Sequence, residues 1–428
     1  MSEPDLAGLL REHALKHSVP GAAIGILRDG ATTTAYHGLA DTGTGEPVTS
    51  ETRFPIGSLT KPMVATLLAR LAEAGRFSLD DRAATHVPEL RGAAWAERAT
   101  VRDLLANRSR LPLSEEVEFS SSAFEDDDEA LARFAARAAT GEQTPPFWSY
   151  TNAGWCLLGR AIETLTGLAW EETMQTNLFA PAGMDDTTFA TRPGAEPCAS
   201  GHEITAEGPV TVEPWVSRAY GPAGASVLST VADMLRFAAL HLEDPFLASL
   251  RASYAEIRIH AWLDAWCLGW ARFDWDGVPV WGWDGLIPGQ RSVLRLMPER
   301  GGAVVLMTNS DTGRAMYRSL FGELLEPLFG ISMPALQLEP SPGAADDLSR
   351  FAGVYAWPDR RWKVTATDTG LVMDGPSGTI EALPVDDCSF LVDVDDPDNP
   401  TMTFGAFDAG GRPGVLYQML WGLPREDL

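Results

Sequence analysis

Positive charge is scarce in this chain. Its 428 residues carry 33 Lys and Arg against 59 Asp and Glu, which gives a formal net charge of −26. Proteins that bind nucleic acid displace counterions with clustered Lys and Arg, so this balance argues against a nucleic-acid partner, and an anionic membrane surface would repel the chain. The acidic excess favours solubility, and a preference for cationic substrates is the alternative interpretation.

Cysteines and long apolar runs are also scarce. The four cysteines show no Cys-x-x-Cys spacing, so neither a zinc site nor a disulfide framework is expected; they are Cys156, Cys198, Cys267 and Cys388. No run of about 18 apolar residues is present, which argues against a membrane span. Residues 1–5 lack the basic start of a signal peptide, which predicts a cytoplasmic location. We expect neither a metal nor a cofactor.

The length of the chain and its proline distribution predict two domains. A chain of this length suggests one large domain followed by a smaller one. Residues 332–346 are rich in proline and small residues, so they form the expected linker after a first domain at 1–331. Short β-like runs separated by turn signals follow at 347–428 and predict a small all-β barrel.

Hydrophobic periodicity predicts an α+β fold for residues 1–331. A helical pattern at 6–17 precedes two β-like runs that meet at Asp29-Gly30, which is a hairpin signal. Residues 80–190 are mostly helical in pattern, and an antiparallel meander of strands is expected at 278–307. We therefore expect an antiparallel sheet built from both ends of this domain, with flanking helices and an all-helical subdomain.

A nucleophile is predicted at Ser58, in the run Phe-Pro-Ile-Gly-Ser-Leu-Thr-Lys-Pro. The apolar spacing of residues 58–75 predicts a helix that Ser58 opens, and Lys61 shares its face three residues on. A serine hydroxyl needs a base to become a strong nucleophile, and a lysine can supply one only if its pKa is lowered. An N-cap serine beside a surface lysine is the alternative interpretation of these four residues.

A second motif, Tyr150-Thr-Asn152, lies just before another apolar helical pattern. Tyr150 and Asn152 are two residues apart, so they can project together from an extended loop. A phenol near a lysine can act as a general base or relay, and an amide can orient a carbonyl group. A loop tyrosine followed by an N-cap asparagine is the alternative.

A third motif, Trp283-Asp284-Gly285-Leu286, lies on the strand that enters the meander. Glycine in a strand often marks a close backbone approach to a ligand. The edge of this strand can supply an N–H group to an oxyanion hole, and Leu286 is the expected donor. A glycine-bent strand with core tryptophans is the alternative.

Taken in this order, the three motifs resemble class C β-lactamases and DD-peptidases, and most closely their esterase, D-aminopeptidase and transacylase relatives. The segments 100–112, 150–189, 223–230 and 308–311 resemble the same family, so the resemblance covers roughly residues 6–330. The C-terminal β-rich segment resembles the lipocalin-like domain that some members carry.

The resemblance implies a role for each matched residue. Ser58 is the acylated nucleophile, and Lys61 and Tyr150 share the acid–base work. Asn152 positions the substrate carbonyl and Lys61. The substrate also contacts Trp283, Asp284, Gly285 and Leu286, with the amides of Ser58 and Leu286 forming the oxyanion hole.

Two positions depart from the family pattern. The third motif of the family usually begins with Lys or His, whereas this chain has Trp283, so a cation that would stabilise a tyrosinate and bind a substrate carboxylate is missing. We therefore expect poor β-lactam hydrolysis. Asp284 would hold a substrate amine or pair with Arg291. Arg110 replaces a usual glycine and would narrow the site or contact the acidic run 115–129.

The leading functional hypothesis is a serine hydrolase that cleaves an ester or amide bond through a seryl acyl-enzyme. An acyltransferase or peptide cyclase that uses the same intermediate is one alternative, and a non-catalytic binding protein is another. The expected partner is a small-molecule or peptide substrate, supplied free or on an acyl carrier. The sequence leaves the oligomeric state open.

Overall fold

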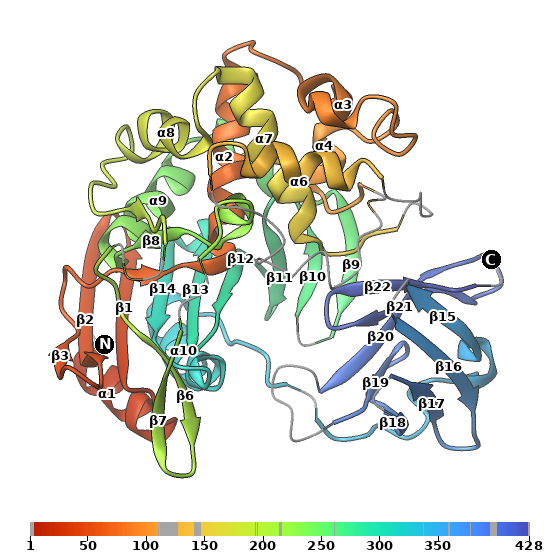
Figure 1. Cartoon of the computed structure of the whole chain (residues 1–428). Helices are drawn as coiled ribbons and strands as arrows, with labels where there is room; N and C mark the ends of the chain where they lie inside the picture. Colours follow the sequence, from red (N-terminus) through yellow and green to blue (C-terminus); the bar gives the residue numbers. More distant parts are fainter. Residues whose placement is uncertain are drawn as a thin grey trace.

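A nine-stranded antiparallel sheet forms the centre of the first domain (Figure 1). The computed structural model describes residues 4–109, 111, 127–140, 147–192, 194, 196–213, 216–260, 262–336, 338–357, 360–376, 378–393 and 400–426. In spatial order the strands are β3 (Glu46–Pro47), β2 (Ala31–Asp41), β1 (Gly21–Arg28), β14 (Gly302–Thr308), β13 (Gln290–Met297), β12 (Val278–Ile287), β11 (Ala271–Trp275), β10 (Leu263–Trp266) and β9 (Ala255–Ile259).

The two ends of the first domain meet in this sheet, as the sequence predicts. β1 pairs with β14, with Gly25 opposite Val305, so the N-terminal hairpin continues the C-terminal meander. The hairpin turns at Asp29 and Gly30, and both residues have the positive φ angles that a tight turn between twisted strands requires. The predicted antiparallel sheet is therefore confirmed.

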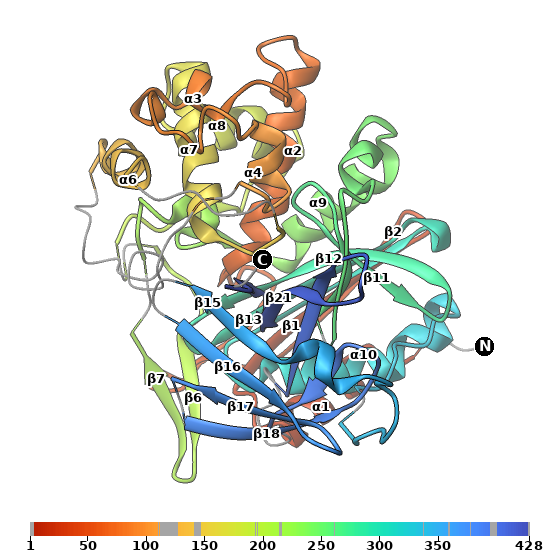
Figure 2. The same ribbon diagram turned by 90° about the vertical axis from the view of Figure 1, so that its right-hand side faces the viewer.

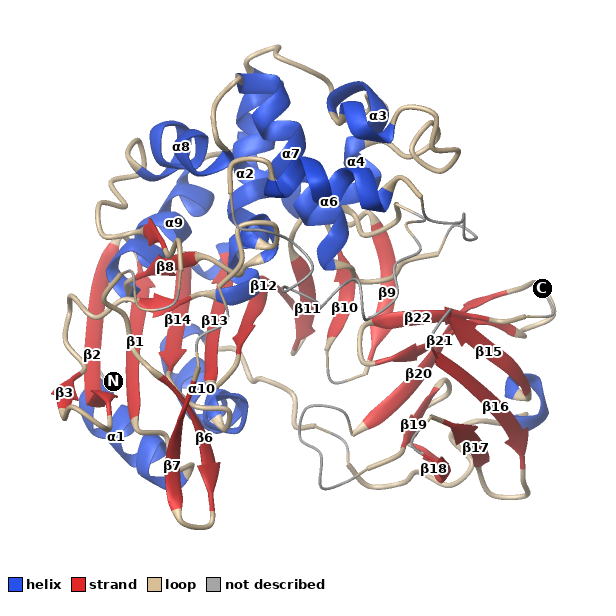
Figure 3. Cartoon of the chain, viewed as in Figure 1, coloured by secondary structure: helices blue, strands red, loops and turns tan. Residues whose placement is uncertain are grey.

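Helices cover both faces of the sheet. α1 (Leu6–Lys16) and α10 (Gly313–Phe329) pack against each other and against β2, β13 and β14, while α9 (Val231–Glu243) packs on β1 and β14. Figure 3 shows the other helices gathered above the sheet. They are α2 (Thr60–Glu73), α3 (Ala83–His86), α4 (Val101–Leu105), α6 (Ala130–Ala138), α7 (Asn152–Thr166) and α8 (Trp170–Met174). This group is the predicted helical subdomain.

Short strands lie beside the main sheet and complete the first domain. β4 (Phe54–Pro55), β8 (Val227–Ser229) and β5 (Thr188–Phe189) form a three-stranded sheet. Its strand β4 ends three residues before the predicted nucleophile Ser58. β6 (Gly201–Thr205) and β7 (Gly208–Val212) form a separate hairpin. Among the described residues, no helix combines the length and apolar character that crossing a membrane requires.

The C-terminal segment folds as a nearly closed eight-stranded barrel. Its strands follow chain order, from β15 (Gly353–Trp357) through β16 (Arg360–Ala366), β17 (Leu371–Gly375), β18 (Gly378–Pro384), β19 (Ser389–Leu391), β20 (Thr401–Phe407) and β21 (Pro413–Gln418) to β22 (Trp421–Pro424). A bridge between Tyr355 and Arg425 brings the first and last strands together. The interior is aromatic, with Phe351, Phe390 and Phe404 in mutual ring contact. The predicted all-β domain is confirmed.

The barrel packs directly against the first domain. Figure 2, seen from the barrel side, shows its strands in front of the central sheet. Val415, Tyr417 and Leu420 belong to the large core of the first domain rather than to the core of the barrel. The ring of Tyr417 lies 6.0 Å from that of Trp148, so the interface is built from buried aromatic groups.

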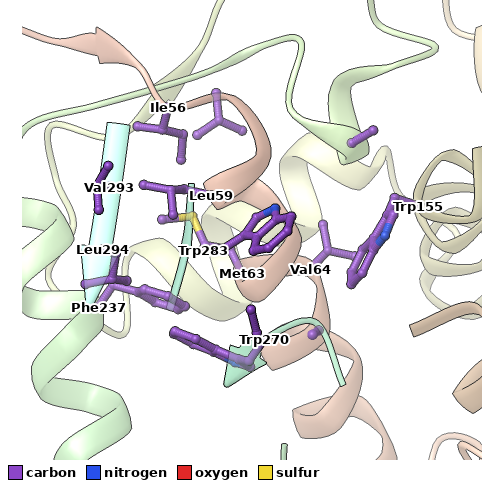
Figure 4. Close-up of a cluster of buried hydrophobic side chains, with 14 of the residues drawn as sticks. Ile56, Leu59, Met63, Val64, Trp155, Phe237, Trp270, Trp283, Val293 and Leu294 are labelled. Carbon is purple, nitrogen blue, oxygen red and sulfur yellow. The ribbon is translucent and has the colours of Figure 1, made fainter. Parts of the chain in front are cut away.

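Part of the large core of the first domain packs around the start of α2. Figure 4 shows Leu59, Met63 and Val64 of this segment packed among Trp155, Trp270 and Trp283. The three tryptophans are at most 3% exposed. This packing holds the first turns of α2 rigidly against the sheet, because close-packed interiors leave side chains little freedom to move.

His241 on α9 gives the fold a pH-dependent stability. Burial, followed by the charges of Arg251 and Arg70, holds the pKa of His241 well below its usual 6.5. Its Nε2 lies 2.8 Å from Thr66 Oγ1, whose hydroxyl donates to Pro62 O, so the neutral ring is satisfied by donating through Nε2. The folded state therefore binds fewer protons than the unfolded state once the pH falls below about 6.5.

We expect the free energy of unfolding to fall as the pH drops below about 6.5, with a contribution from His241 of up to about 1.4 kcal/mol per pH unit. Urea unfolding at a series of pH values measures this slope. His241→Gln should flatten it by that amount. Ile162→Val, a core change without a titrating group, is the control and should lower stability equally at every pH. An unchanged slope in His241→Gln would contradict the assignment.

Candidate active site

Ser58 lies where the chain turns from β4 into α2. Residues 57–59 form one 3₁₀ turn, and α2 continues from Thr60. The half-buried Ser58 hydroxyl oxygen accepts two hydrogen bonds, one from Lys61 Nζ at 2.8 Å and one from the Tyr150 hydroxyl at 2.9 Å. The predicted nucleophile is thus held between an amine and a phenol.

Lys61 is fully buried and is oriented by three acceptors. Besides Ser58 Oγ, its Nζ donates to Asn152 Oδ1 at 2.8 Å and to the backbone oxygen of Ala223 at 2.6 Å. The three contacts fix the amine toward the serine, whereas a surface lysine would sample many rotamers. The alternative of a surface lysine beside an N-cap serine is therefore wrong.

Tyr150 receives a hydrogen bond from Trp283. Trp283 Nε1 donates to the Tyr150 hydroxyl at 3.2 Å, and the two rings lie 5.4 Å apart. A neutral indole N–H thus lies where the family usually places a cation. An N–H donor stabilises a phenolate oxygen, but less strongly than a positive charge does.

Asn152 is the first residue of α7, and Thr151 is the N-cap residue. The Asn152 side chain is therefore not the cap of α7, and its Oδ1 instead accepts the hydrogen bond from Lys61 Nζ at 2.8 Å. α7 ends at Gly167 with a positive φ of 74°, as the glycine in the sequence predicts.

The edge of β12 approaches the serine turn very closely. The pairing of β12 with β11 runs from Val278 to Gly282, and the rest of β12 continues beside the turn that holds Ser58. A Cβ atom on Gly285 would lie 1.8 Å from Ile56 O, and one on Gly57 would lie 2.6 Å from Leu286 N. Only glycine permits this approach, which brings the amides of the serine turn and of Leu286 to the same region.

Asp284 pairs with Arg295 at 2.6 Å, so the expected pairing with Arg291 is wrong. Val293 lies directly opposite Asp284 in the ladder, so Arg291 and Arg295 flank it on the same face of β13. The aromatic rings of Phe273 and Tyr317, 4.3 Å and 4.9 Å from the guanidinium, hold Arg295 beside Asp284. Asp284 is thus already paired with a cation.

A pocket of about 200 Å³ opens above Ser58, and we call it the active-site pocket. It is lined by all the predicted site residues except the buried Lys61. It also contains residues that the sequence did not indicate, chiefly Ala223, Gly224, Trp262 and the barrel residues Met419, Leu420 and Trp421. Position 224 requires glycine, because a Cβ atom there would lie 2.4 Å from the backbone of Gly57.

The barrel also holds the backbone of the tyrosine loop. Tyr150 N donates to Leu420 O at 3.0 Å, and Gly422 N donates to Ser149 Oγ at 3.1 Å. The β21–β22 turn therefore both lines the active-site pocket and positions Tyr150. Arg110 and most of the acidic run 115–129 lie outside the described residues.

One group of possible metal ligands lies elsewhere in the described chain. Asp386, Asp387 and Cys388 in the connection between β18 and β19 bring their ligand atoms within 4.8 Å of one another. Burial, and then the charges of the two aspartates, raise the pKa of Cys388 to about 12. The thiol is thus protonated at neutral pH.

Comparison with known proteins identifies the family. The beta-lactamase family model matches residues 6–325. Penicillin-binding protein 4 of Amycolatopsis lactamdurans is 34% identical over 363 residues, which covers 79% of this chain and 94% of that protein. The chain therefore belongs to the beta-lactamase family and is a serine hydrolase of that family.

Solved structures of two proteins resemble this chain. The crystal structure of SurE has a TM-score of 0.81 and 28% sequence identity, covering 98% of each chain, and a second SurE structure contains D-Leu. D-amino acid amidase from Ochrobactrum anthropi SV3, complexed with D-phenylalanine, has a TM-score of 0.61 and 26% identity, covering 71% of this chain and 90% of the amidase. The likeness to SurE thus extends through the barrel.

Proposed function

We propose that this protein hydrolyses an ester or amide bond of a small peptide or amino acid derivative through an acyl-enzyme on Ser58. The observation that carries this proposal is the pair of hydrogen bonds from Lys61 and Tyr150 to one serine oxygen at the mouth of a pocket. An activated serine in an apolar cavity with a few convergent polar groups is typical of acyl transfer.

In the proposed reaction, the Lys61–Tyr150 pair first gives up one proton to solvent, and Ser58 Oγ then bonds to the acyl carbon while its own proton passes to the vacant position on the pair. The amides of Ser58 and Leu286 stabilise the negative charge on the acyl oxygen. The leaving group takes the proton and departs, and Asn152 orients the acyl carbonyl. Water then attacks the seryl ester while its proton passes to the same pair. The pair returns this proton to Ser58 Oγ as the bond to the acyl carbon breaks and the carboxylic acid leaves.

We further propose that the chain is not an efficient β-lactamase. Trp283 donates its single neutral N–H to the Tyr150 oxygen, and the nearby Arg295 is paired with Asp284. A β-lactam carboxylate thus lacks the cation that the family usually supplies at this position. The relatives crystallised with D-Leu and D-phenylalanine favour derivatives of apolar D-amino acids as substrates.

A second candidate function is transfer of the acyl group to an amine or alcohol, including closure of a peptide onto itself. The apolar wall formed by Trp262, Met419, Leu420 and Trp421 favours this candidate, because it limits water around the acyl-enzyme and offers surface to an organic acceptor. An acyl group on a carrier thioester is a suitable donor for the same intermediate. A product that forms only with an added amine distinguishes transfer from hydrolysis.

A fluorophosphonate probe tests the proposal. We expect it to label Ser58, as read by peptide mass spectrometry, and Ser58→Ala to lose labelling and at least about 10⁴-fold in kcat/KM on p-nitrophenyl esters. Ser292→Ala is the matched control, because Ser292 lines the same pocket without a lysine contact among the described residues. The control should keep labelling and activity.

Two results would contradict the proposal. A folded protein that the probe does not label would indicate a non-catalytic binding protein. Rapid turnover of a chromogenic cephalosporin, compared with esters and D-amino acid amides in the same panel, would show that Trp283 does not disfavour β-lactams.

A further inference from the structure

A second cavity of about 250 Å³ adjoins the active-site pocket. It lies between strands β9–β12, helix α10 and residues 333–336, and shares Trp262, Trp283, Asp284 and Arg314 with the active-site pocket. We call it the cationic pocket, because its lining includes Arg258, Arg295, Arg314 and Arg318. The two cavities therefore meet at these four shared residues.

The positive charges of this pocket exceed the negative charges that face them. Its described lining holds four arginines against three aspartates, Asp264, Asp274 and Asp284. Asp284 pairs with Arg295, and Asp264 lies 3.8 Å from Arg258. Asp274 is shared with Arg272, which is not part of the lining. The lining thus carries one more arginine than aspartate, in a chain whose net charge is −26.

Arg318 is the lining arginine whose positive charge we compare with the nearby carboxylates. It lies one turn after Arg314 on α10, so the two cations share a face of the helix. Its Nη2 donates to Pro334 O at 3.1 Å, and among the described residues it forms no ion pair with a carboxylate. Burial is the largest cause that lowers the pKa of Arg318, and the charges of Arg314 and Arg295 also lower it, whereas Tyr317 and Asp284 raise it. An anion at this place would relieve the repulsion.

Arg295 and Arg314 also place guanidinium N–H groups in the lining of this pocket. Arg295 is 1% exposed, and its Nε lacks a hydrogen-bond partner among the described residues. The guanidinium of Arg314 lies 4.0 Å from the centre of the Trp262 ring, which fixes its plane at the boundary between the two pockets. Planar guanidinium groups bind carboxylate and phosphate oxygens in matching geometry.

We propose that the cationic pocket binds a carboxylate or phosphate group carried at the far end of the substrate whose acyl carbon reacts at Ser58. This inference rests on the proposed function, and it adds a class of substrate to it, namely acyl donors with an anionic terminus. The apolar residues between the two pockets would contact the chain that joins the acyl carbon to the anion.

Matched p-nitrophenyl esters test the inference. Each set has one chain length and ends in a methyl group, a carboxylate or a phosphate monoester, and the length increases from set to set. We expect one anionic ester to exceed its methyl-ended counterpart in kcat/KM by about tenfold or more, chiefly through a lower KM, because charge-assisted hydrogen bonds bind the terminus. The carboxylate and phosphate arms identify which group the pocket prefers.

Arg318→Gln should abolish this preference and leave the turnover of methyl-ended esters within about twofold of the parent. Arg300→Gln, which removes an exposed arginine from the turn before β14, is the matched control and should keep the preference. Should Arg318→Gln fail to fold, Arg258→Gln at the more exposed side of the pocket should reduce the preference in its place.

Two results would overturn the inference. One is an Arg318→Gln enzyme that keeps the full preference, and the other is a parent enzyme that turns over methyl-ended esters as well as both anionic esters at every length. Both results require turnover that depends on Ser58. If no ester shows such turnover, the proposed function itself fails, so the two failures are distinguishable.

Discussion

Lys61→Met is expected to lower kcat/KM on esters and amides by about 10³-fold or more. The substitution keeps the length of the side chain but removes the amine that donates to Ser58 Oγ, Asn152 Oδ1 and Ala223 O. General-base assistance by a positioned side chain contributes typically 10²–10⁴-fold. The loss should fall on kcat and on the rate of fluorophosphonate labelling, since both require an activated serine.

The composition of the chain supplies unusually good controls for this prediction. It has three lysines, and Lys16 and Lys363 are both exposed, so Lys61 is the buried one. Lys16→Met and Lys363→Met make the same chemical change on the surface and should leave kcat/KM within about twofold. Thermal unfolding of all three variants separates lost chemistry from lost structure. Full activity in a folded Lys61→Met enzyme would show that Tyr150 acts alone as the base.

Gly285→Ala is the second substitution with a large expected effect. A Cβ atom at this position would lie 1.8 Å from Ile56 O, so β12 must move away from the serine turn. That movement separates the amide of Leu286 from Ser58. Because the loss of one oxyanion-hole donor costs about 10²–10³ in kcat, we expect kcat to fall by about 10²-fold with a smaller change in KM.

Gly282→Ala is the matched control for Gly285→Ala. It lies on the same strand, and its Cβ would lie 2.0 Å from Leu294 O, so it also forces a backbone shift, but one away from β13 rather than away from the serine turn. We expect both variants to lose stability, by about 1–3 kcal/mol, and only Gly285→Ala to lose most of its kcat. Equal losses of kcat in the two variants would show that the strand matters for stability alone.

Much of the fold could be predicted because its signals are local. The hairpin at Asp29-Gly30, the helix after Ser58 and the helix end at Gly167 each follow from periodicity or turn chemistry within a few residues. The motifs that contain Ser58, Lys61, Tyr150 and Asn152 carry recognisable residue types at fixed spacing, and the structure brings these four side chains together, while their catalytic roles stay predictions.

The parts that were missed depend on long-range geometry. Ala223 and Leu420 accept hydrogen bonds from Lys61 and Tyr150 through their backbone oxygens. Every residue type has such an oxygen, so the sequence does not indicate these contacts. The partner of Asp284 depends on the register of β12 and β13, and both Arg291 and Arg295 satisfy the sequence pattern. The barrel could be predicted from its strands, but its contribution to the active-site pocket depends on how two cores pack together.

The hydrogen bond from Tyr150 N to Leu420 O links the loop that carries Tyr150 in the first domain to the barrel. Binding at the active site therefore depends on how the barrel docks. The active-site pocket is lined by Trp283 from the first domain and by Trp421 from the barrel, so a ligand that fills it would contact both domains. By thermodynamic linkage, such a ligand tightens the docking of the barrel by the same free energy with which docking tightens the ligand. Ligand binding at the site and docking of the barrel on the first domain are therefore linked equilibria in this chain.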